Sequence, residues 1–240
     1  PALAWWYFGD PRTLLVLLGS FGLALLLRNQ SSWPRVMLCS VGLGVLYAWA
    51  LGMVFGEPIA ALATELQKIL PDMLSDAYQQ LSVEEQARLE ALLTPVLTGL
   101  LAALLQITTL LSLILGRYWQ ALLYNPGGFG LEFQALRFSP ALAMVLLVGM
   151  LLGPSLGTHM AMLAPLCSVP LVFAGVALVH GLVAKNRMSR FWLVGLYVTL
   201  VLFMQLIYPL LAVVAIVDSL FDFRGRASRN DDAGPAGGEG

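Results

Sequence analysis

Charged residues are scarce in this sequence: Asp, Glu, Lys and Arg make up 11% of the 240 residues, whereas an ordinary soluble domain holds roughly 25%. Hydrophobic residues make up 59%. Six windows contain no charged residue at all, namely 13–27, 36–55, 94–115, 141–163, 165–184 and 191–217. A soluble protein could not keep so much uncharged chain away from water, so the composition predicts a polytopic membrane protein. It excludes a soluble enzyme, a disulfide scaffold and a free nucleic-acid-binding protein.

Residues of the types that usually carry chemistry are also few. The two cysteines, Cys39 and Cys167, lie in or beside apolar windows, so we expect two buried thiols rather than a disulfide. His159 and His180 are 21 residues apart, the sequence has no His-Glu-x-x-His motif, and no carboxylate lies inside a window. The sequence therefore predicts no metal site and no cofactor. The net charge of −1 indicates no nucleic-acid partner.

What the sequence has in abundance is long apolar runs, and a membrane-spanning helix needs about 20 apolar residues. Residues 138–184 carry no formal charge and are long enough for two spans, with a turn favoured near 164–168. The last window suits a tilted span that is kinked or broken at Pro209. We predict an all-α, polytopic transmembrane helical bundle of about six spans. It would form a single domain over 1–220, followed by a disordered tail at 221–240.

Most of the polar residues lie between the second and third windows, in residues 56–93. Seven carboxylates there outnumber two basic residues, and apolar residues such as Ile59, Leu62 and Leu66 recur at helical spacing. Ser82 and Glu85 have the spacing of a helix capping box. We therefore predict amphipathic extramembrane helices in this segment. For this segment, solvent-exposed helices outside the membrane are favoured over a lid on a substrate site.

The side of the membrane follows from Lys and Arg in short loops, which favour the cytoplasm. With six spans, the loops at 28–35, 116–139 and 185–190 lie on one side and carry seven basic residues. We predict a multi-pass protein of the bacterial cytoplasmic (inner) membrane, with the lipid bilayer as its surroundings. The basic residues of the tail also favour the cytoplasm and conflict with this count, so the side of the tail stays open.

The loop at 116–139 is more elaborate than joining two spans requires. Asn125-Pro-Gly-Gly128 is typical of a turn, and aromatic residues on both sides of it suit a membrane interface. We expect an interfacial helix, a glycine turn and a second helix, acting as a docking surface for a partner or as an interfacial anchor. The docking candidates are Arg117, Asn125, Gly127, Gly128, Glu132 and Arg137.

Gly153-Pro-Ser-Leu-Gly157 matches the G-x-S-x-G pattern of serine hydrolases, and an intramembrane hydrolase could use Ser155 with His180 as its base. The pattern normally needs a strand before the serine, and both flanks here are apolar helix. Gly149, Gly153 and Gly157 recur every four residues, which favours close helix packing. We therefore predict a protein that is not an enzyme and has no catalytic residues.

A few neutral polar residues and one histidine lie deep inside the predicted spans. Hydrogen bonds between helices account for them, and they are also candidates for lining a ligand cavity. These cavity candidates are Gln106, Thr109, His180 and Gln205.

Two motifs carry a resemblance to a known family: Gly116-Arg-Tyr-Trp-Gln with Asn125-Pro-Gly-Gly-Phe129, Glu132-Phe133 and Leu136-Arg137, and, far downstream, Asp218-Ser-Leu-Phe-Asp-Phe-Arg224. In these residues the chain resembles the YybS-like family of bacterial integral membrane proteins. That family's fold is similar to the substrate-binding S components of energy-coupling-factor (ECF) vitamin transporters, which are bundles of about six spans. The resemblance implies a bound small molecule and a protein partner on the cytoplasmic side, and no catalytic residues.

Three functions therefore follow as hypotheses. The first is a small-molecule-binding or transport subunit with a cavity near the outer leaflet, roofed by residues 56–93. The second is a membrane scaffold or assembly factor that acts through residues 116–137. The third, and least favoured, is the intramembrane hydrolase.

Overall fold

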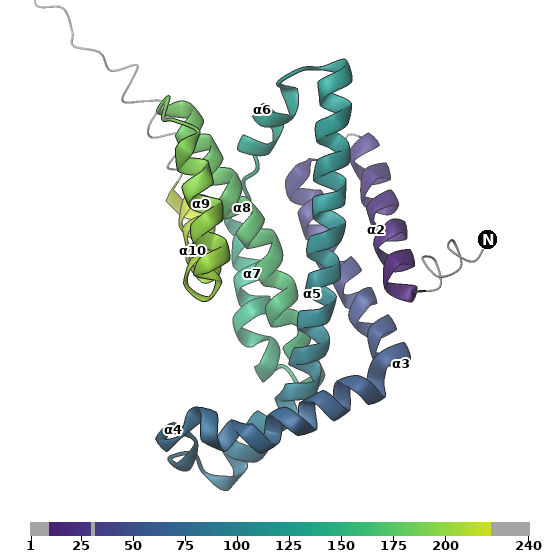
Figure 1. Cartoon of the computed structure of the whole chain (residues 1–240), viewed down its shortest axis with the longest axis vertical. Helices are drawn as coiled ribbons and strands as arrows, with labels where there is room; N and C mark the ends of the chain where they lie inside the picture. Colours follow the sequence, from purple (N-terminus) through teal and green to yellow (C-terminus); the bar gives the residue numbers. More distant parts are fainter. Residues whose placement is uncertain (1–9, 30–31, 222–240) are drawn as a thin grey trace, which may run out of the picture. The chain divides into compact units, whose positions relative to one another are not determined.

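The computed structural model describes residues 10–29 and 32–221, and every regular element in these ranges is a helix (Figure 1). This confirms the all-α prediction. The α-helices are α2 (Pro11–Arg28), α3 (Trp33–Leu74), α4 (Asp76–Gln79), α5 (Val83–Tyr124), α6 (Gly128–Gln134), α7 (Pro140–Leu152), α8 (Leu163–Lys185), α9 (Phe191–Leu202) and α10 (Met204–Phe221). Two 3-10 turns, η1 (Gly153–Ser155) and η2 (Thr158–Met162), join α7 to α8.

Five helical stretches of the described chain are long and apolar enough to cross a membrane: Pro11–Arg28, Trp33–Leu74, Val83–Tyr124, Thr158–Lys185 and Met204–Phe221. Shorter apolar helices cover Pro140–Ser155 and Phe191–Leu202. Large apolar side chains such as Phe21, Trp49 and Leu111 are exposed on these helices. Helices with such outer faces fit a hydrocarbon environment, because their backbone groups are satisfied internally. The architecture is that of a multi-pass membrane protein.

The contacts within the chain gather into two compact units. Unit 1 comprises residues 1–124 and 146–170, and unit 2 comprises residues 125–145 and 171–240. The single domain over residues 1–220 stays a prediction. Of the tail expected at residues 221–240, Phe221 is the last residue of α10, and the rest lies outside the described residues.

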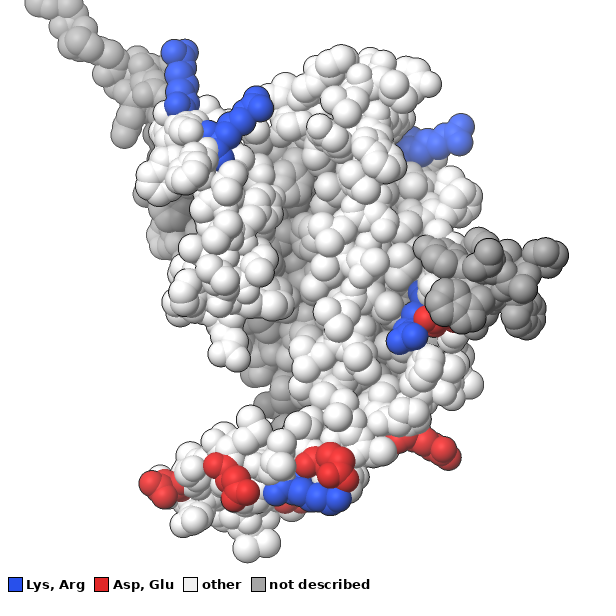
Figure 2. Space-filling view, viewed as in Figure 1, with Lys and Arg blue, Asp and Glu red and all other residues white. Residues whose placement is uncertain are grey.

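In unit 1, α3 and α5 are each 42 residues long. A straight helix of that length measures about 63 Å, twice the roughly 30 Å of a hydrocarbon core. Both helices must therefore continue beyond the membrane. The charged side chains of the predicted extramembrane segment are exposed, apart from the half-buried Glu90, and Figure 2 shows acidic residues gathered over this end of α3, α4 and the start of α5.

The helices of this segment form largely as their residues predict. Ser82 accepts a hydrogen bond from the Glu85 backbone N–H at 3.3 Å, and the Glu85 carboxylate accepts from the Ser82 backbone N–H at 2.8 Å and from its hydroxyl at 2.7 Å. These bonds lower the pKa of Glu85 below its ordinary value. The capping box is confirmed. Pro71 does not end the preceding helix, which continues to Leu74.

The turn expected near 164–168 and the break offered as one alternative at Pro209 both fall at other residues. The chain turns between α7 and α8 at residues 153–162 rather than 164–168, and Pro165 lies in the first turn of α8, where its missing N–H costs no hydrogen bond. The turn uses Gly157, whose φ of +142° suits only glycine. The last apolar window is broken at Phe203 (φ −124°, ψ 43°), whereas Pro209 lies inside α10.

The glycines of the small-residue stripe have two different roles. A Cβ on Gly149 would lie 2.7 Å from Cys167 Sγ, and one on Gly153 would lie 2.8 Å from the Met160 carbonyl oxygen. Gly149 therefore permits the close approach of α7 and α8, as predicted, whereas Gly153 and Gly157 lie in the turn. Both cysteines are free thiols, but Cys39 is exposed, so the expectation of burial is correct for Cys167 alone.

In unit 2, α9 and α10 pack against one another, and the chain reverses direction between them (Figure 1). The end of α10 therefore returns to the end of this helix pair at which α9 begins. Gly175 of α8 meets the backbone of Leu211 on α10, where any side chain would collide with the Leu211 carbonyl oxygen. This packing anchors α10 to α8 within the unit.

Candidate functional site

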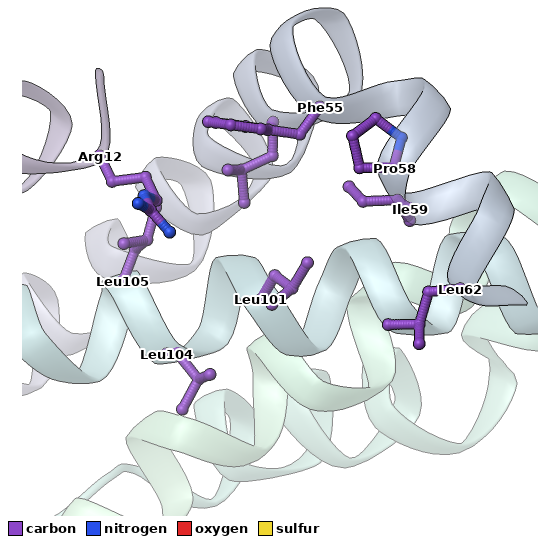
Figure 3. Close-up of a pocket in the computed structure, with 9 residues that line it drawn as sticks. Arg12, Phe55, Pro58, Ile59, Leu62, Leu101, Leu104 and Leu105 are labelled. Atoms are coloured by element: carbon purple, nitrogen blue, oxygen red, sulfur yellow. The ribbon is translucent and has the colours of Figure 1, made fainter. Parts of the chain in front are cut away.

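The candidate site is a cavity of about 320 Å³ in unit 1, between the start of α2, the bend of α3 and the middle of α5 (Figure 3). Arg12 and Leu105 lie at one side of it and Leu62 at the other. Of the residues that line it, Arg12 alone is polar. The lining residues are Arg12, Leu51, Phe55, Pro58, Ile59, Leu62, Leu101, Leu104 and Leu105.

The cavity exists because α3 bends at the end of its apolar window. Phe55 has the non-helical angles φ −120° and ψ 19°, and Pro58 three residues later has no N–H to donate to the Val54 carbonyl. The two limbs of α3 therefore meet α5 in different directions. Leu51 before the bend and Ile59 after it both face the cavity. Pro58, Ile59 and Leu62 come from the segment at 56–93 that was predicted to roof a ligand cavity.

Arg12 makes two contacts at the side of the cavity. Its Nε donates to both carboxylate oxygens of Asp10, at 2.9 and 3.0 Å, and its Nη2 lies 2.8 Å from Asp10 Oδ2. Its guanidinium lies 5.6 Å from the centroid of the Phe55 ring, within the range of a cation–π interaction. The hydrogen bonds from Arg12 lower the pKa of Asp10 below its ordinary value, because they stabilise the ionised carboxylate. Sequence reasoning missed Arg12, because it directly precedes an uncharged window.

A second hollow, an apolar groove of about 610 Å³, lies between α2 and α3 in the same unit. Glycines on both helices keep it open, and its lining is almost entirely aliphatic. No charged side chain is among the residues that line it, and the hydroxyl of Tyr47, one of those residues, is bonded to Leu15 and Thr109. The lining residues are Leu15, Leu18, Gly19, Gly22, Leu23, Leu26, Cys39, Gly42, Leu43, Leu46 and Tyr47.

Gln106 and Thr109, two of the predicted cavity residues, line neither hollow. Both are fully buried in the interior of unit 1. Gln106 Nε2 donates to Ser40 Oγ at 2.9 Å, and Thr109 Oγ1 lies 2.9 Å from the Tyr47 hydroxyl, which donates to the Leu15 carbonyl. These bonds join α2, α3 and α5, which is the helix-bonding role that the sequence also allowed.

The other two predicted cavity residues, His180 and Gln205, lie in unit 2. His180 Nδ1 lies 2.9 Å from the Val176 carbonyl oxygen and Nε2 lies 3.3 Å from the Tyr197 hydroxyl. The ring also packs edge-on against Phe133. Gln205 is exposed at the start of α10. With both His180 nitrogens engaged elsewhere, the hydrolase hypothesis gains no support, and the described residues hold no group of three that could bind a metal ion.

The predicted docking loop has the expected turn. Gly127 has φ +85°, and the Gly128 N–H donates to the Asn125 carbonyl at 3.0 Å. Asn125 and Gly127 are exposed, whereas Gly128 and Glu132 are half-buried. Arg117 is half-buried and donates to Gln120 at 2.9 Å along its own helix. The first helix expected in the loop is the last part of α5 rather than a separate element.

Arg137, the last docking candidate, binds its own chain. Its Nε and Nη2 donate to the Asp218 carbonyl at 3.2 and 3.1 Å, and its Nη2 reaches the Ser219 carbonyl at 3.4 Å. Its Nε also lies 3.9 Å from the carboxylate of Asp218, whose side chain is only 2% exposed. A cation at this position suits the C-terminal carbonyls of α10. Sequence reasoning missed the pair of Arg137 and Asp218, although each residue belongs to one of the two motifs that carry the family resemblance.

No protein family, no curated protein and no solved structure matches this chain.

Proposed function

We propose that this protein is a small-molecule-binding subunit of the bacterial cytoplasmic membrane, similar in kind to the S components of ECF transporters. The observation that carries the proposal is the cavity at the bend of α3, with apolar walls and one arginine. Its volume of about 320 Å³ lies within the range of ligand pockets, which are mostly apolar with a few placed polar groups. Such a subunit would hand its ligand to a transport partner on the cytoplasmic side.

The position of the cavity supports binding rather than a purely structural gap. It lies where the apolar window of α3 ends and the acidic extramembrane segment begins, so a molecule could enter from the membrane surface. The walls belong to three helices that are also joined by the buried bonds of Gln106 and Tyr47.

The alternative, a scaffold acting through residues 116–137, has fewer candidate residues than the sequence suggested. Arg137 binds the end of α10 and Arg117 binds Gln120, so the exposed part of the turn is Asn125 to Gly127. The cavity is therefore the better-supported site.

The test of this function is to fill the cavity. In Leu101→Trp the indole would occupy the space next to α3, and we expect binding of small amphipathic probes to fall at least tenfold, as measured by calorimetry in phosphatidylcholine nanodiscs. Leu111→Trp is the matched control, because Leu111 is an exposed leucine on the same helix that does not line the cavity. Equal binding by the wild type and Leu101→Trp would refute the proposal.

A further inference from the structure

The chemistry of the cavity wall indicates which class of molecule fits it. Eight of the nine lining residues offer only hydrocarbon, aromatic or proline surface, and the ninth is the Arg12 guanidinium at one side. Hydrocarbon walls favour an apolar body, and a guanidinium favours a carboxylate, sulfonate or phosphate. Because the cation lies at one side only, the complementary molecule carries its charge at one end.

We infer that the cavity binds a single-chain amphipathic anion, with its apolar chain among the leucines of α5 and its charged head on Arg12. This inference rests on the proposed function and names the class of its ligand. At about 320 Å³ the cavity is at the lower end of the range for ligand pockets, so it suits one chain rather than the two chains of a phospholipid. Arg12 lies beside Leu105 at one side of the cavity and Leu62 lies at the other (Figure 3), so the apolar chain of the ligand would run from Arg12 past Leu101 toward Leu62.

Asp10 has a defined part in this arrangement. It accepts hydrogen bonds from the Nε of Arg12 and pairs with Nη2, which is how a ligand carboxylate would bind an arginine. The Asp10 carboxylate therefore occupies one anion position of Arg12 and competes there with the head of the ligand. The Arg12 side chain is 58% exposed, so the exchange of one anion for the other needs no rearrangement of the core.

The test compares decanesulfonate, which stays ionised at all working pH values, with the uncharged decanol. Binding is measured by calorimetry to the full chain in phosphatidylcholine nanodiscs, with empty nanodiscs subtracted. We expect wild type to prefer decanesulfonate and Arg12→Gln to lower the ratio of the two affinities by about tenfold. Arg12→Lys should keep part of the preference, whereas Asp10→Asn should raise it, since the competing carboxylate is gone.

The outcomes separate the inference from the proposed function. Equal affinities for the two probes in wild type, or an unchanged ratio in Arg12→Gln, would overturn the anion assignment while leaving the cavity as a binding site. If neither probe binds wild type, or if Leu101→Trp binds both as wild type does, the proposed function fails with it. Displacement of decanesulfonate by phosphatidylglycerol added to the nanodiscs would overturn the single-chain assignment and identify a lipid headgroup as the anion. Thermal unfolding of each variant confirms that it is folded.

Discussion

Two arginines of this chain illustrate how much a residue's role depends on its partners. Arg12 directly precedes an apolar window, and its guanidinium lies at a cavity, paired with Asp10 and over the Phe55 ring. Arg137 lies in a loop that was predicted as a docking surface. Its guanidinium N–H groups donate instead to a carbonyl of α10, and it lies beside the buried Asp218 carboxylate. Neither the contact of Arg12 with Phe55 nor that of Arg137 with Asp218 can be read from the local pattern, because both join residues distant in sequence.

Arg137→Gln should destabilise unit 2 more than an ordinary surface substitution does. The change removes the cation beside a buried carboxylate, and leaving a buried charged group without its partner costs about 2 kcal/mol or more. Adding Asp218→Asn to the same chain should recover part of the loss, since the neutral amide needs no cation. Thermal unfolding of the two single variants and the double variant measures the coupling, and additive losses would contradict a direct interaction between the two side chains.

At the scale of elements, the bends and ends of helices were harder to foresee than the helices themselves. Five prolines lie inside described helices without ending them, at Pro58, Pro71, Pro95, Pro170 and Pro209. The actual breaks fall at Phe55, at Gly153 to Gly157 and at Phe203. A helix that packs on its neighbours tolerates the loss of one backbone hydrogen bond, because burial of its face outweighs that loss. Helix capping at Ser82, in contrast, depends on adjacent residues only, and the sequence predicted it correctly.

Ser82→Ala should loosen the first turn of α5. It removes the side-chain bond to the Glu85 N–H and one of two bonds that lower the pKa of Glu85, so that pKa should rise toward its ordinary value. We expect amide hydrogen exchange over residues 83–90 to increase about fivefold. Ser112→Ala, on the same helix and with its hydroxyl bonded to the Thr108 carbonyl, is the matched control.

The same capping box predicts a pH dependence. The pKa of Glu85 is lowered in the folded protein, so the capping contribution is fully present above the ordinary pKa of a glutamate. It is lost as the pH falls through the lower, folded-state pKa. Exchange rates corrected for intrinsic pH effects should show this loss in wild type and a smaller one in Ser82→Ala; the same pH profile in both would contradict the role of Ser82.

At the scale of the whole molecule, the distribution of charge matches a membrane orientation within unit 1. Arg28 ends α2 and Arg35 lies in the first turn of α3, and about 30 Å of helix separates Arg35 from the bend at Phe55. Beyond the bend lies the acidic segment. The basic residues Arg28 and Arg35 and the acidic segment at 56–93 therefore lie at opposite ends of a length of α3 that is long enough to cross the hydrocarbon core.

This separation predicts the accessibility of introduced thiols in a background in which Cys39 and Cys167 are replaced by serine and alanine. In whole cells, Asp76→Cys in α4 should react with a membrane-impermeant maleimide, and Asn29→Cys after α2 should react only once the membrane is opened. The opposite pattern would invert the orientation. Reaction of both residues in intact cells would mean that the stretch between them does not cross the membrane.

The sequence alone determined the class of this protein, because the absence of charge over six windows leaves helices in a membrane as the physical solution. It also determined the acidic helical segment, the capping box and the glycine turn, which all follow from residues near one another in the chain. The tertiary structure decided where the last two apolar runs turn, and that Gln106 and Thr109 join helices. It also decided that Arg12 meets Phe55 at a cavity and that Arg137 meets Asp218. Those outcomes depend on which helix faces pack together. The sequence does not indicate these faces, because a membrane helix has apolar residues on all sides.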